Sequence, residues 1–290
     1  MTWALVLTAP AGRGLSDDEI GAIAGALGEE AAEPRRLGVA AAEIACERRP
    51  AVVPLRDTFQ GIDINAVPAA NRRKRILIAD MDSTIIPVEC IDEVADYAGV
   101  KAAVAAITER AMAGELDFAD AVRARLTLLK GLPEAILADV YAERVRLNPG
   151  ARTLVRTMAA AGVHTLLVSG GFTYFTSRVA AAAGFAEHRA NRLVIEDGLL
   201  TGRAAEPILG REAKLQALTE AANRLGVSPA DALAVGDGAN DLAMVEAAGL
   251  GVAYRAKPVL AARADAEIRH ADLTALLHLQ GYSEGEFVHD

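Results

Sequence analysis

The hydrophobic pattern of the chain changes near residue 75. Beyond it, short apolar runs that each end at a polar residue alternate with segments of helical periodicity. Such runs are typical of parallel strands buried on both faces of a sheet. The runs cover 76–79 before Asp80, 163–168 before Ser169, and 232–236 before Asp237. Helices are predicted over 151–160, 174–183 and 211–225, and Gly226 is suited to end the last of them.

One connection between these strands is much longer than a crossover requires. Asp80 and Val163 are 83 residues apart, whereas a dozen or so residues suffice for a βαβ crossover. The surplus shows apolar spacing of i, i+3 and i+4, with Asp117 as a helix cap and Pro133 in a first turn. These positions predict an inserted helical subdomain over 87–148, with helices over 89–97, 101–113, 118–129 and 134–145.

Residues 1–72 form a separate small α+β unit in this interpretation. Strands are expected at 4–8 and 37–46 and a helix at 17–27, while the Asp197-Gly198 pair indicates a small hairpin further along the chain. The basic stretch 71–75 marks the boundary of this unit. We interpret it as a solvated linker, in preference to an anion-binding segment.

Composition narrows the class of protein. The 290 residues include 52% hydrophobic and 24% charged positions, which is the balance of a globular chain of about two domains. A net charge of −9 argues against a nucleic-acid partner. The uncharged run 157–177 is interrupted by glycine, histidine and serine, so no membrane span is expected. No basic leader precedes the first apolar residues, and Cys46 and Cys90 lack disulfide or metal-site spacing, which favours the cytoplasm.

Paired carboxylates give the sharpest chemical signal. Asp80 and Asp82 follow one buried strand, and Asp237 and Asp241 follow another. Buried carboxylates repel one another, so a cation is required, and an all-oxygen site suits Mg²⁺. A turn or helix cap is the simpler alternative for each pair taken alone. A calcium EF-hand loop starting at Asp80 is excluded, because its glycine and glutamate positions would both be isoleucine.

Two further features suit a phosphate. Ser169, Gly170 and Gly171 lie between a strand and a helix, where free backbone N–H groups bind anions well. Lys214 is the only lysine between Lys130 and Lys257, although a surface position is its ordinary alternative. The five histidines show no zinc-site or triad spacing, which leaves little support for another nucleophile.

The ordered motifs Asp-x-Asp-x-Thr, Ser-Gly-Gly, Lys and Gly-Asp-Gly-x-Asn-Asp resemble the haloacid dehalogenase superfamily over about residues 75–280. The resemblance implies a Rossmannoid α/β core at 73–86 and 149–290, the helical insertion as a cap, and residues 1–72 as a small, ACT-like domain. It also implies a role for each motif residue. Asp80 would be the nucleophile and Asp82 the general acid and base; Ser169, Gly170, Gly171, Lys214 and Asn240 would hold the substrate; Asp80, the Asp82 carbonyl and Asp237 would bind Mg²⁺, with Asp241 behind them.

Within this superfamily, the chain is similar to the phosphoserine phosphatases. The similarity includes Glu89, Met112, Phe118 and the segment 125–130, although Met81 replaces a usual aromatic residue. Arg125 falls on the apolar stripe of its helix, and Arg123 points about 200° away. The resemblance implies that Glu89 binds an ammonium group, Arg125 a carboxylate, and the other two form an apolar lid. An internal salt bridge between Arg125 and Glu89, and ordinary core packing of the lid residues, are the alternatives.

These features predict hydrolysis of phosphoserine as the last step of serine biosynthesis. Two alternatives stay open at this point. The first is a related phosphatase or phosphotransferase acting on another small phosphate, such as phosphothreonine or phosphohomoserine. The second is an amino-acid-sensing protein that works through residues 1–72, although a docking domain fits that segment equally well. The resemblance also allows a homodimer.

Overall fold

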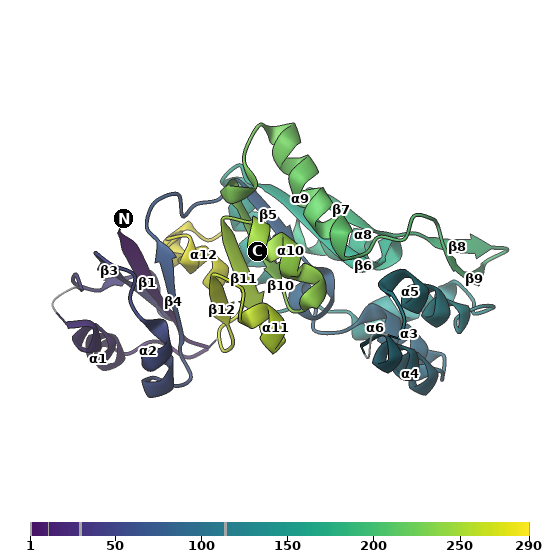
Figure 1. Cartoon of the computed structure of the whole chain (residues 1–290), viewed down its shortest axis with the longest axis horizontal. Coiled ribbons are helices and arrows are strands. Elements are labelled where there is room, and N and C mark those ends of the chain that lie inside the picture. The colour runs from purple at the N-terminus through teal and green to yellow at the C-terminus, as the bar shows by residue number, and fades with distance from the viewer. Residues whose placement is uncertain (1, 11, 29–30, 113–114, 290) are drawn as a thin grey trace.

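A computed structural model describes residues 2–10, 12–28, 31–112 and 115–289 and contains a large parallel sheet, a smaller antiparallel sheet and a helical unit (Figure 1). The large sheet has the strand order β12-β11-β10-β5-β6-β7, and every neighbouring pair is parallel. The predicted parallel α/β core is therefore confirmed. Its strands are β5 (Ile76–Ala79), β6 (His164–Phe172), β7 (Glu187–Asn191), β10 (Ala232–Gly236), β11 (Leu250–Tyr254) and β12 (Ala266–Ile268).

Helices cover both faces of this sheet because alternate strand residues point to opposite sides. Leu77 and Ala79 pack toward α7, α8 and α12, while Ile76 and Ile78 pack toward α9, α10 and α11. Gly226, with φ of 64°, ends α9 as expected. Among the helices that the structure describes, none has the length and apolar character needed to cross a bilayer. The helices are α7 (Ala151–Ala160), α8 (Thr173–Ala183), α9 (Arg211–Leu225), α10 (Leu242–Ala247), α11 (Pro258–Ala261) and α12 (Ala275–Leu279).

The long insertion folds into four helices at one end of the molecule (Figure 1). The Asp117 side chain accepts the backbone N–H of Asp120, so the predicted cap is confirmed. Pro133 does not lie in the first turn of α6, because it precedes the capping residue and instead forms a β-bridge with Leu199. The four are α3 (Cys90–Tyr97), α4 (Lys101–Met112), α5 (Phe118–Thr127) and α6 (Ala135–Arg144).

The predicted hairpin is attached to these helices. Strands β8 (Leu193–Glu196) and β9 (Leu199–Ala204) are joined by Asp197 and Gly198, which have φ of 50° and 73°. Positive φ at both turn residues is what a tight two-residue hairpin requires. Leu200 exchanges backbone hydrogen bonds with Gly131 and Leu132, at 2.8 and 2.9 Å, in the connection between α5 and α6. The hairpin therefore extends the helical unit.

The N-terminal unit is an antiparallel sheet of order β2-β3-β1-β4, with α1 and α2 packed on one face. The second predicted strand is shorter than expected, because a separate β2 precedes it and residues 37–40 form a turn. The other face of the sheet contributes Ala4, Val6 and Val67 to the core that contains α12. Its elements are β1 (Trp3–Thr8), α1 (Asp17–Leu27), β2 (Arg35–Arg36), β3 (Ala41–Cys46), α2 (Val52–Thr58) and β4 (Asp63–Pro68).

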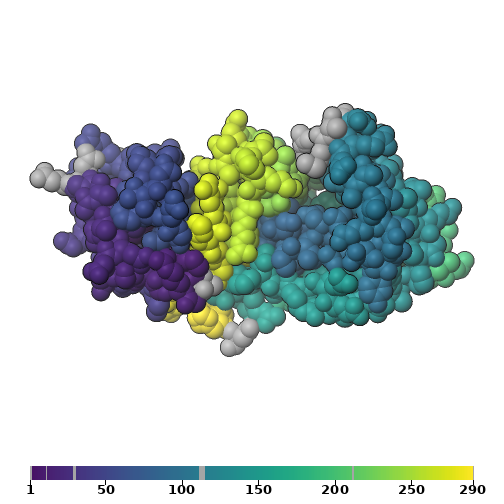
Figure 2. Space-filling view, turned by 90° about the horizontal axis from the view of Figure 1, so that it is seen from below, coloured from purple at the N-terminus to yellow at the C-terminus, as the bar shows by residue number. Residues whose placement is uncertain are grey.

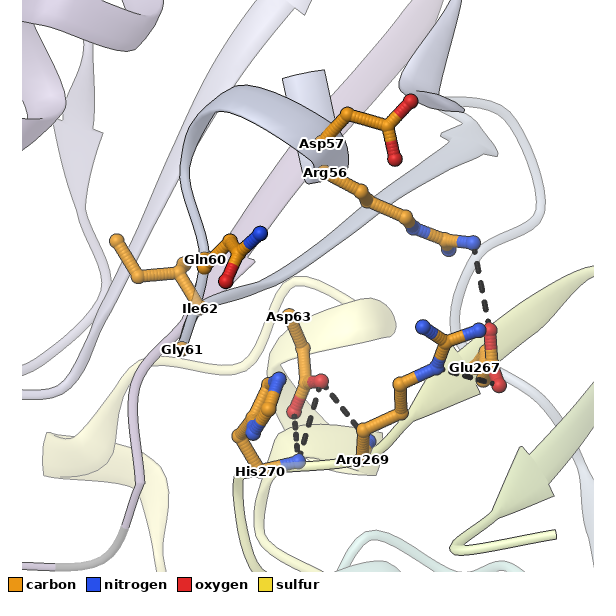
Figure 3. A pocket seen from close by; sticks show the side chains of 9 residues that line it. All are labelled: Arg56, Asp57, Gln60, Gly61, Ile62, Asp63, Glu267, Arg269 and His270. Carbon is orange, nitrogen blue, oxygen red and sulfur yellow. Dashed lines mark hydrogen bonds and ion pairs between the residues drawn. The ribbon is translucent and has the colours of Figure 1, made fainter. Parts of the chain in front are cut away.

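Buried polar groups join the two sheets between β4 and β12. The Asp63 carboxylate accepts the backbone N–H groups of residues 269–271 at 2.8 to 3.2 Å. Asn65 both donates to and accepts from the Glu267 backbone at 2.9 Å, and Arg56 pairs with the Glu267 side chain at 3.5 Å. Arg56, Asp63 and Glu267 line a cavity of about 320 Å³ at this junction (Figure 3). Figure 2 shows the N-terminal unit and the helical unit at opposite ends of the molecule, with the parallel core between them.

The basic stretch 71–75 is only partly a solvated linker, because positions 71, 73 and 75 are exposed whereas Arg72 and Lys74 are held by the fold. The Arg72 guanidinium donates to the carbonyls of His278 and Leu279 at the end of α12 and pairs with Glu43 at 2.7 Å. Lys74 is 8% exposed and donates to the Ala230 carbonyl. A cation at the carboxyl end of a helix satisfies carbonyls that have no partner within the helix. The charges of Arg72 and Lys74 are therefore used inside the fold.

Candidate active site

The predicted chemical residues meet at the carboxyl ends of three neighbouring strands. Asp80 follows β5, Asp237 follows β10, and Ser169 lies near the end of β6. All three are buried, with exposed fractions of 8% or less. Parallel strands place their carboxyl ends at one edge of the sheet, which is where ligands bind in open α/β folds. The expectation that these residues converge is confirmed by their positions.

Lys214 is the cation at the centre of this group. Its Nζ lies 2.7 Å from Asp80 Oδ1 and 2.6 Å from Asp241 Oδ1, and the residue is 2% exposed. Burial alone would lower the pKa of Lys214, but the charges of Asp80 and Asp241 outweigh burial and raise it. Burial and the charge of Asp241 raise the pKa of Asp80 well above its usual range, and Lys214 opposes this shift. The surface alternative for Lys214 is therefore wrong.

Asp241 holds the loop after β10 in place. Its Oδ2 accepts the backbone N–H groups of Asp237 and Gly238, both at 3.1 Å, while its Oδ1 accepts Lys214. A Cβ atom at Gly236 would overlap the Asp241 carboxyl group, so the close approach requires glycine there. Both Asp241 oxygens are thus used by the protein, in agreement with a position behind the metal ligands.

Three carboxylates could hold a cation. Asp80, Asp237 and Asp241 each bring an oxygen within 4.8 Å of the others, and all three are buried. Burial and the charge of Asp241 raise the pKa of Asp237 as well, and the charges of Lys257 and Lys214 only partly oppose this. Both Asp241 oxygens accept hydrogen bonds of 2.6 to 3.1 Å, whereas among the described residues Asp80 Oδ2 meets only the Asn240 amide at 3.5 Å and Asp237 Oδ2 only Lys257 at 3.8 Å. Asp80 and Asp237 therefore fit a divalent ion best. The donor set of buried carboxylate oxygens therefore fits a divalent ion such as Mg²⁺.

Asp82 is held from two sides. Its Oδ1 accepts the backbone N–H of Cys90 at 2.8 Å, and its Oδ2 accepts the Ser169 hydroxyl at 2.9 Å. Burial raises the pKa of Asp82, and these hydrogen bonds work against the rise. The structure thus gives Cys90 a contact that the sequence analysis missed. That contact uses the backbone, so no side-chain pattern could have predicted it.

Glu89 and Arg125 lie on the cap side of this group. Ser83, whose φ of 57° is left-handed, donates its hydroxyl to Glu89 Oε1 at 2.7 Å. The protein atoms packed around the Glu89 carboxylate desolvate it, and this desolvation together with the charge of Asp82 raises its pKa to about 7. The residue as a whole is still exposed to solvent. The Arg125 Nε donates to the Ala121 carbonyl at 3.3 Å. Within the described ranges, no carboxylate lies within 4 Å of its guanidinium, so the expected alternative of a salt bridge to Glu89 is not present.

Phe118, Asn240 and the two glycines also lie around this group. Phe118 reaches from the start of α5 over the serine–glycine turn, where its Cζ lies 3.0 Å from the position a Cβ of Gly170 would take. The Asn240 amide lies 3.5 Å from Asp80 Oδ2, and Gly171 donates its N–H to Ser169 Oγ at 2.8 Å. The Met112 side chain lies outside the described residues. The turn itself forms the irregular end of β6, and α8 begins only at Thr173, so Ser169 to Gly171 do not directly begin a helix.

Known proteins resemble this chain in sequence and in fold. The haloacid dehalogenase-like hydrolase model matches residues 77–246. A phosphoserine phosphatase of Polaromonas is 49% identical over 210 residues, which cover 71% of this chain and 89% of the relative. A solved haloacid dehalogenase (HAD) family hydrolase of Salmonella enterica serovar Typhi has a TM-score of 0.86 and 31% identity over 96% of this chain and 98% of its own. A protein of Vibrio cholerae named a probable phosphoserine phosphatase has a TM-score of 0.80 and 34% identity over 97% of this chain and 86% of its own. The chain therefore belongs to the haloacid dehalogenase-like hydrolases.

Proposed function

We propose that the protein hydrolyses O-phospho-L-serine to L-serine and phosphate in the cytoplasm, as the last step of serine biosynthesis. The observation that carries the proposal is the joint placement of a buried phosphoryl-transfer site and two residues of opposite charge at its rim, Glu89 and Arg125. Relatives that carry the phosphoserine phosphatase name support it. In this proposal residues 87–148 are the cap, residues 73–86 and 149–290 the catalytic core, and residues 1–72 an accessory domain.

The chemistry proceeds in two steps at Asp80. One Asp80 carboxylate oxygen attacks phosphorus, the bond from phosphorus to the serine oxygen breaks, and Asp82 gives its proton to that oxygen. The product is an aspartyl-phosphate. Asp82, now charged, removes a proton from water, whose oxygen attacks phosphorus and releases phosphate with Asp80 restored. Burial raises the pKa of Asp82, which suits a group that must first carry a proton.

Electrostatics explains the remaining groups. Lys214 is placed to balance charge on the phosphoryl oxygens, and Ser169 with Gly170 and Gly171 can donate hydrogen bonds to them. Asp80, Asp237 and the Asp82 carbonyl would hold Mg²⁺, which supplies positive charge to the phosphoryl oxygens when bound. An oxygen-only donor set of this kind suits Mg²⁺ better than a softer metal.

Glu89 and Arg125 would select the amino acid. Phosphoserine carries an ammonium and a carboxylate beside its phosphate, and the two rim residues have the matching charges. Burial lowers the pKa of Arg125, and the charges of Asp92 and Glu89 only partly oppose this, so the guanidinium is short of a partner. An arginine in that state gains most from an incoming carboxylate. A site that pairs both charges rejects phosphates that lack them.

Phosphate release from a panel of phosphomonoesters, with and without Mg²⁺, tests the function. We expect phosphoserine to have the highest kcat/KM, with little release after the metal is removed. A higher kcat/KM for sugar phosphates would overturn the substrate assignment, and higher values for phosphothreonine or phosphohomoserine would move it within the same class.

Replacing Arg125 with alanine is expected to lower kcat/KM for phosphoserine about 10- to 100-fold, mainly through KM, because a charge-assisted hydrogen bond is lost. Turnover of phosphoethanolamine, which has the ammonium but no carboxylate, should change little. Arg123 offers a matched control on the same helix, since it faces outward and pairs with Asp120 and Glu206. Equal losses on both substrates, or in R123A, would contradict the carboxylate assignment.

A further inference from the structure

The serine–glycine turn is a bulge in the sheet. Val168 of β6 pairs with Arg189 of β7, and the next pair is Phe172 with Asn191. Four steps along β6 therefore match only two along β7, and residues 169–171 arch out of the ladder. Bulged residues lose their regular hydrogen-bond partners. Gly170 and Gly171 are partly buried, so a carbonyl in the arch gains from another donor.

Asn191 supplies that donor. Its Nδ2 donates to the Gly170 carbonyl at 2.8 Å, and its Oδ1 accepts the Leu209 N–H at 2.7 Å. Because the Gly170 oxygen can only accept and the Leu209 nitrogen can only donate, the orientation of the amide is determined by its partners. Asn191 is 2% exposed, and its two partners, Gly170 and Leu209, are partly buried. Its side chain ties the arch to the segment that leads into α9 and Lys214.

This contact sets the direction of a peptide group that faces the active site. In a trans peptide the carbonyl and the N–H point in opposite directions. Holding the Gly170 carbonyl toward Asn191 therefore turns the Gly171 N–H toward the site, where it donates to Ser169 Oγ at 2.8 Å. The Ser169 hydroxyl in turn donates to Asp82 Oδ2 at 2.9 Å. A continuous path of hydrogen bonds joins Asn191 to Asp82.

The two glycines make such a restraint necessary. A Cβ at Gly171 would lie 3.0 Å from Ser169 Oγ and 3.1 Å from Asp82 Oδ2, and one at Gly170 would lie 3.0 Å from Phe118 Cζ. A side chain at either position would therefore press against a residue of the site. The peptide between two glycines is also the one that rotates most freely. If it turned over, a carbonyl oxygen would face the Ser169 hydroxyl oxygen and the phosphoryl oxygens.

We infer that Asn191 is a positioning residue that holds the Gly170–Gly171 peptide in its catalytic orientation. The inference deepens the proposed function and rests on it for the role of the arch. Asn191 does not touch the reacting atoms. It acts through Ser169 and Gly171, which bear only on the phosphoryl group and on Asp82.

Asn191→Asp tests this role, because the carboxylate keeps an acceptor for Leu209 but cannot donate to the Gly170 carbonyl. We expect kcat/KM to fall about 10- to 100-fold, and by the same factor for phosphoserine and for p-nitrophenyl phosphate, because the arch faces only the phosphoryl group. The Kd of inorganic phosphate, measured by calorimetry with Mg²⁺, should rise about tenfold. Asn191→Ser is the second variant, for use if the aspartate variant does not fold, because serine adds no charge and is too short to reach Gly170. It should show the same fall in kcat/KM and the same rise in the Kd of phosphate.

Asn65→Asp is the matched control. Asn65 is 1% exposed and makes the same donor and acceptor pair with the Glu267 backbone, in the junction between the sheets, while its Oδ1 also accepts the Arg56 guanidinium at 2.6 Å. We expect this variant to keep kcat/KM within about twofold of the wild type. The inference falls if the Asn191 variants stay within that range, or if they lose activity on phosphoserine alone. A wild type that turns over only p-nitrophenyl phosphate would overturn the substrate assignment, and the Asn191 comparison would still be decided on that ester and on phosphate binding.

Discussion

Replacing Asp80 with asparagine is expected to lower kcat at least about 10⁴-fold, because the amide cannot form the acyl phosphate on which both chemical steps depend. The folded structure should survive the change. An asparagine of the same shape keeps an oxygen that can accept the Met81 N–H and Lys214, and it removes the repulsion from Asp241 that helps to raise the pKa of Asp80. Steady-state kinetics with thermal unfolding of the same sample measures both effects.

The control for this variant is Asp63→Asn. Asp63 is also buried, at 3% exposure, but it accepts three backbone N–H groups at the junction between the sheets. An amide there turns a donor toward donors, so we expect lower stability with kcat within a few-fold of the wild type. Asp80→Ala is measured beside it, because an asparagine can deamidate back to aspartate and an alanine cannot. If both variants kept more than about 1% of kcat, Asp80 would not be the nucleophile.

The strands that the sequence predicted well are those in which burial and apolar character coincide. β5 and β10 have the predicted bounds because every side chain in them is buried between two layers of helices. β4 was not predicted, since Asp63 and Asn65 interrupt its apolar pattern. Both are buried because their partners are backbone groups near β12, more than 200 residues away. No local pattern contains that information.

The residues of the candidate site also fall into those that the sequence could predict and those that it could not. Asp80, Ser169, Lys214 and Asp237 could be predicted, because strand ends converge and buried acids require a cation. Asn191 also ends a parallel strand, but its partners are the backbone groups of Gly170 and Leu209. Arg72 and Lys74 misled the interpretation for a related reason, since a basic run gives no sign of the carbonyls that bury it. Side-chain chemistry is visible in a sequence, whereas bonds to distant backbone groups are not.

Replacing Lys214 with methionine is expected to lower kcat/KM about 10³-fold at saturating Mg²⁺ and to destabilise the metal-free protein by about 3–5 kcal/mol at pH 8. The buried ammonium is the partner of Asp80 and Asp241, and its removal leaves their charges uncompensated. The destabilisation should shrink as the pH falls. Burial raises the pKa values of Asp80, Asp82 and Asp237, so these groups take up protons in the folded protein above their ordinary range, and protonation replaces the missing cation.

Denaturant unfolding of the wild type and Lys214→Met, in chelator at pH 8 and at pH 5, separates this electrostatic role from simple packing. Lys74→Met is the matched control, because Lys74 is also buried but donates to the Ala230 carbonyl at the opposite end of β5. Its loss of stability should depend little on pH, and its kcat/KM should stay within a few-fold of the wild type. A pH-independent loss in Lys214→Met would mean that the lysine fills space, and activity within tenfold of the wild type would mean that the phosphoryl group does not depend on it. Recovery of stability but not of turnover on adding Mg²⁺ is the result we expect, because a divalent ion can neutralise the acids without replacing the ammonium that balances the phosphoryl oxygens.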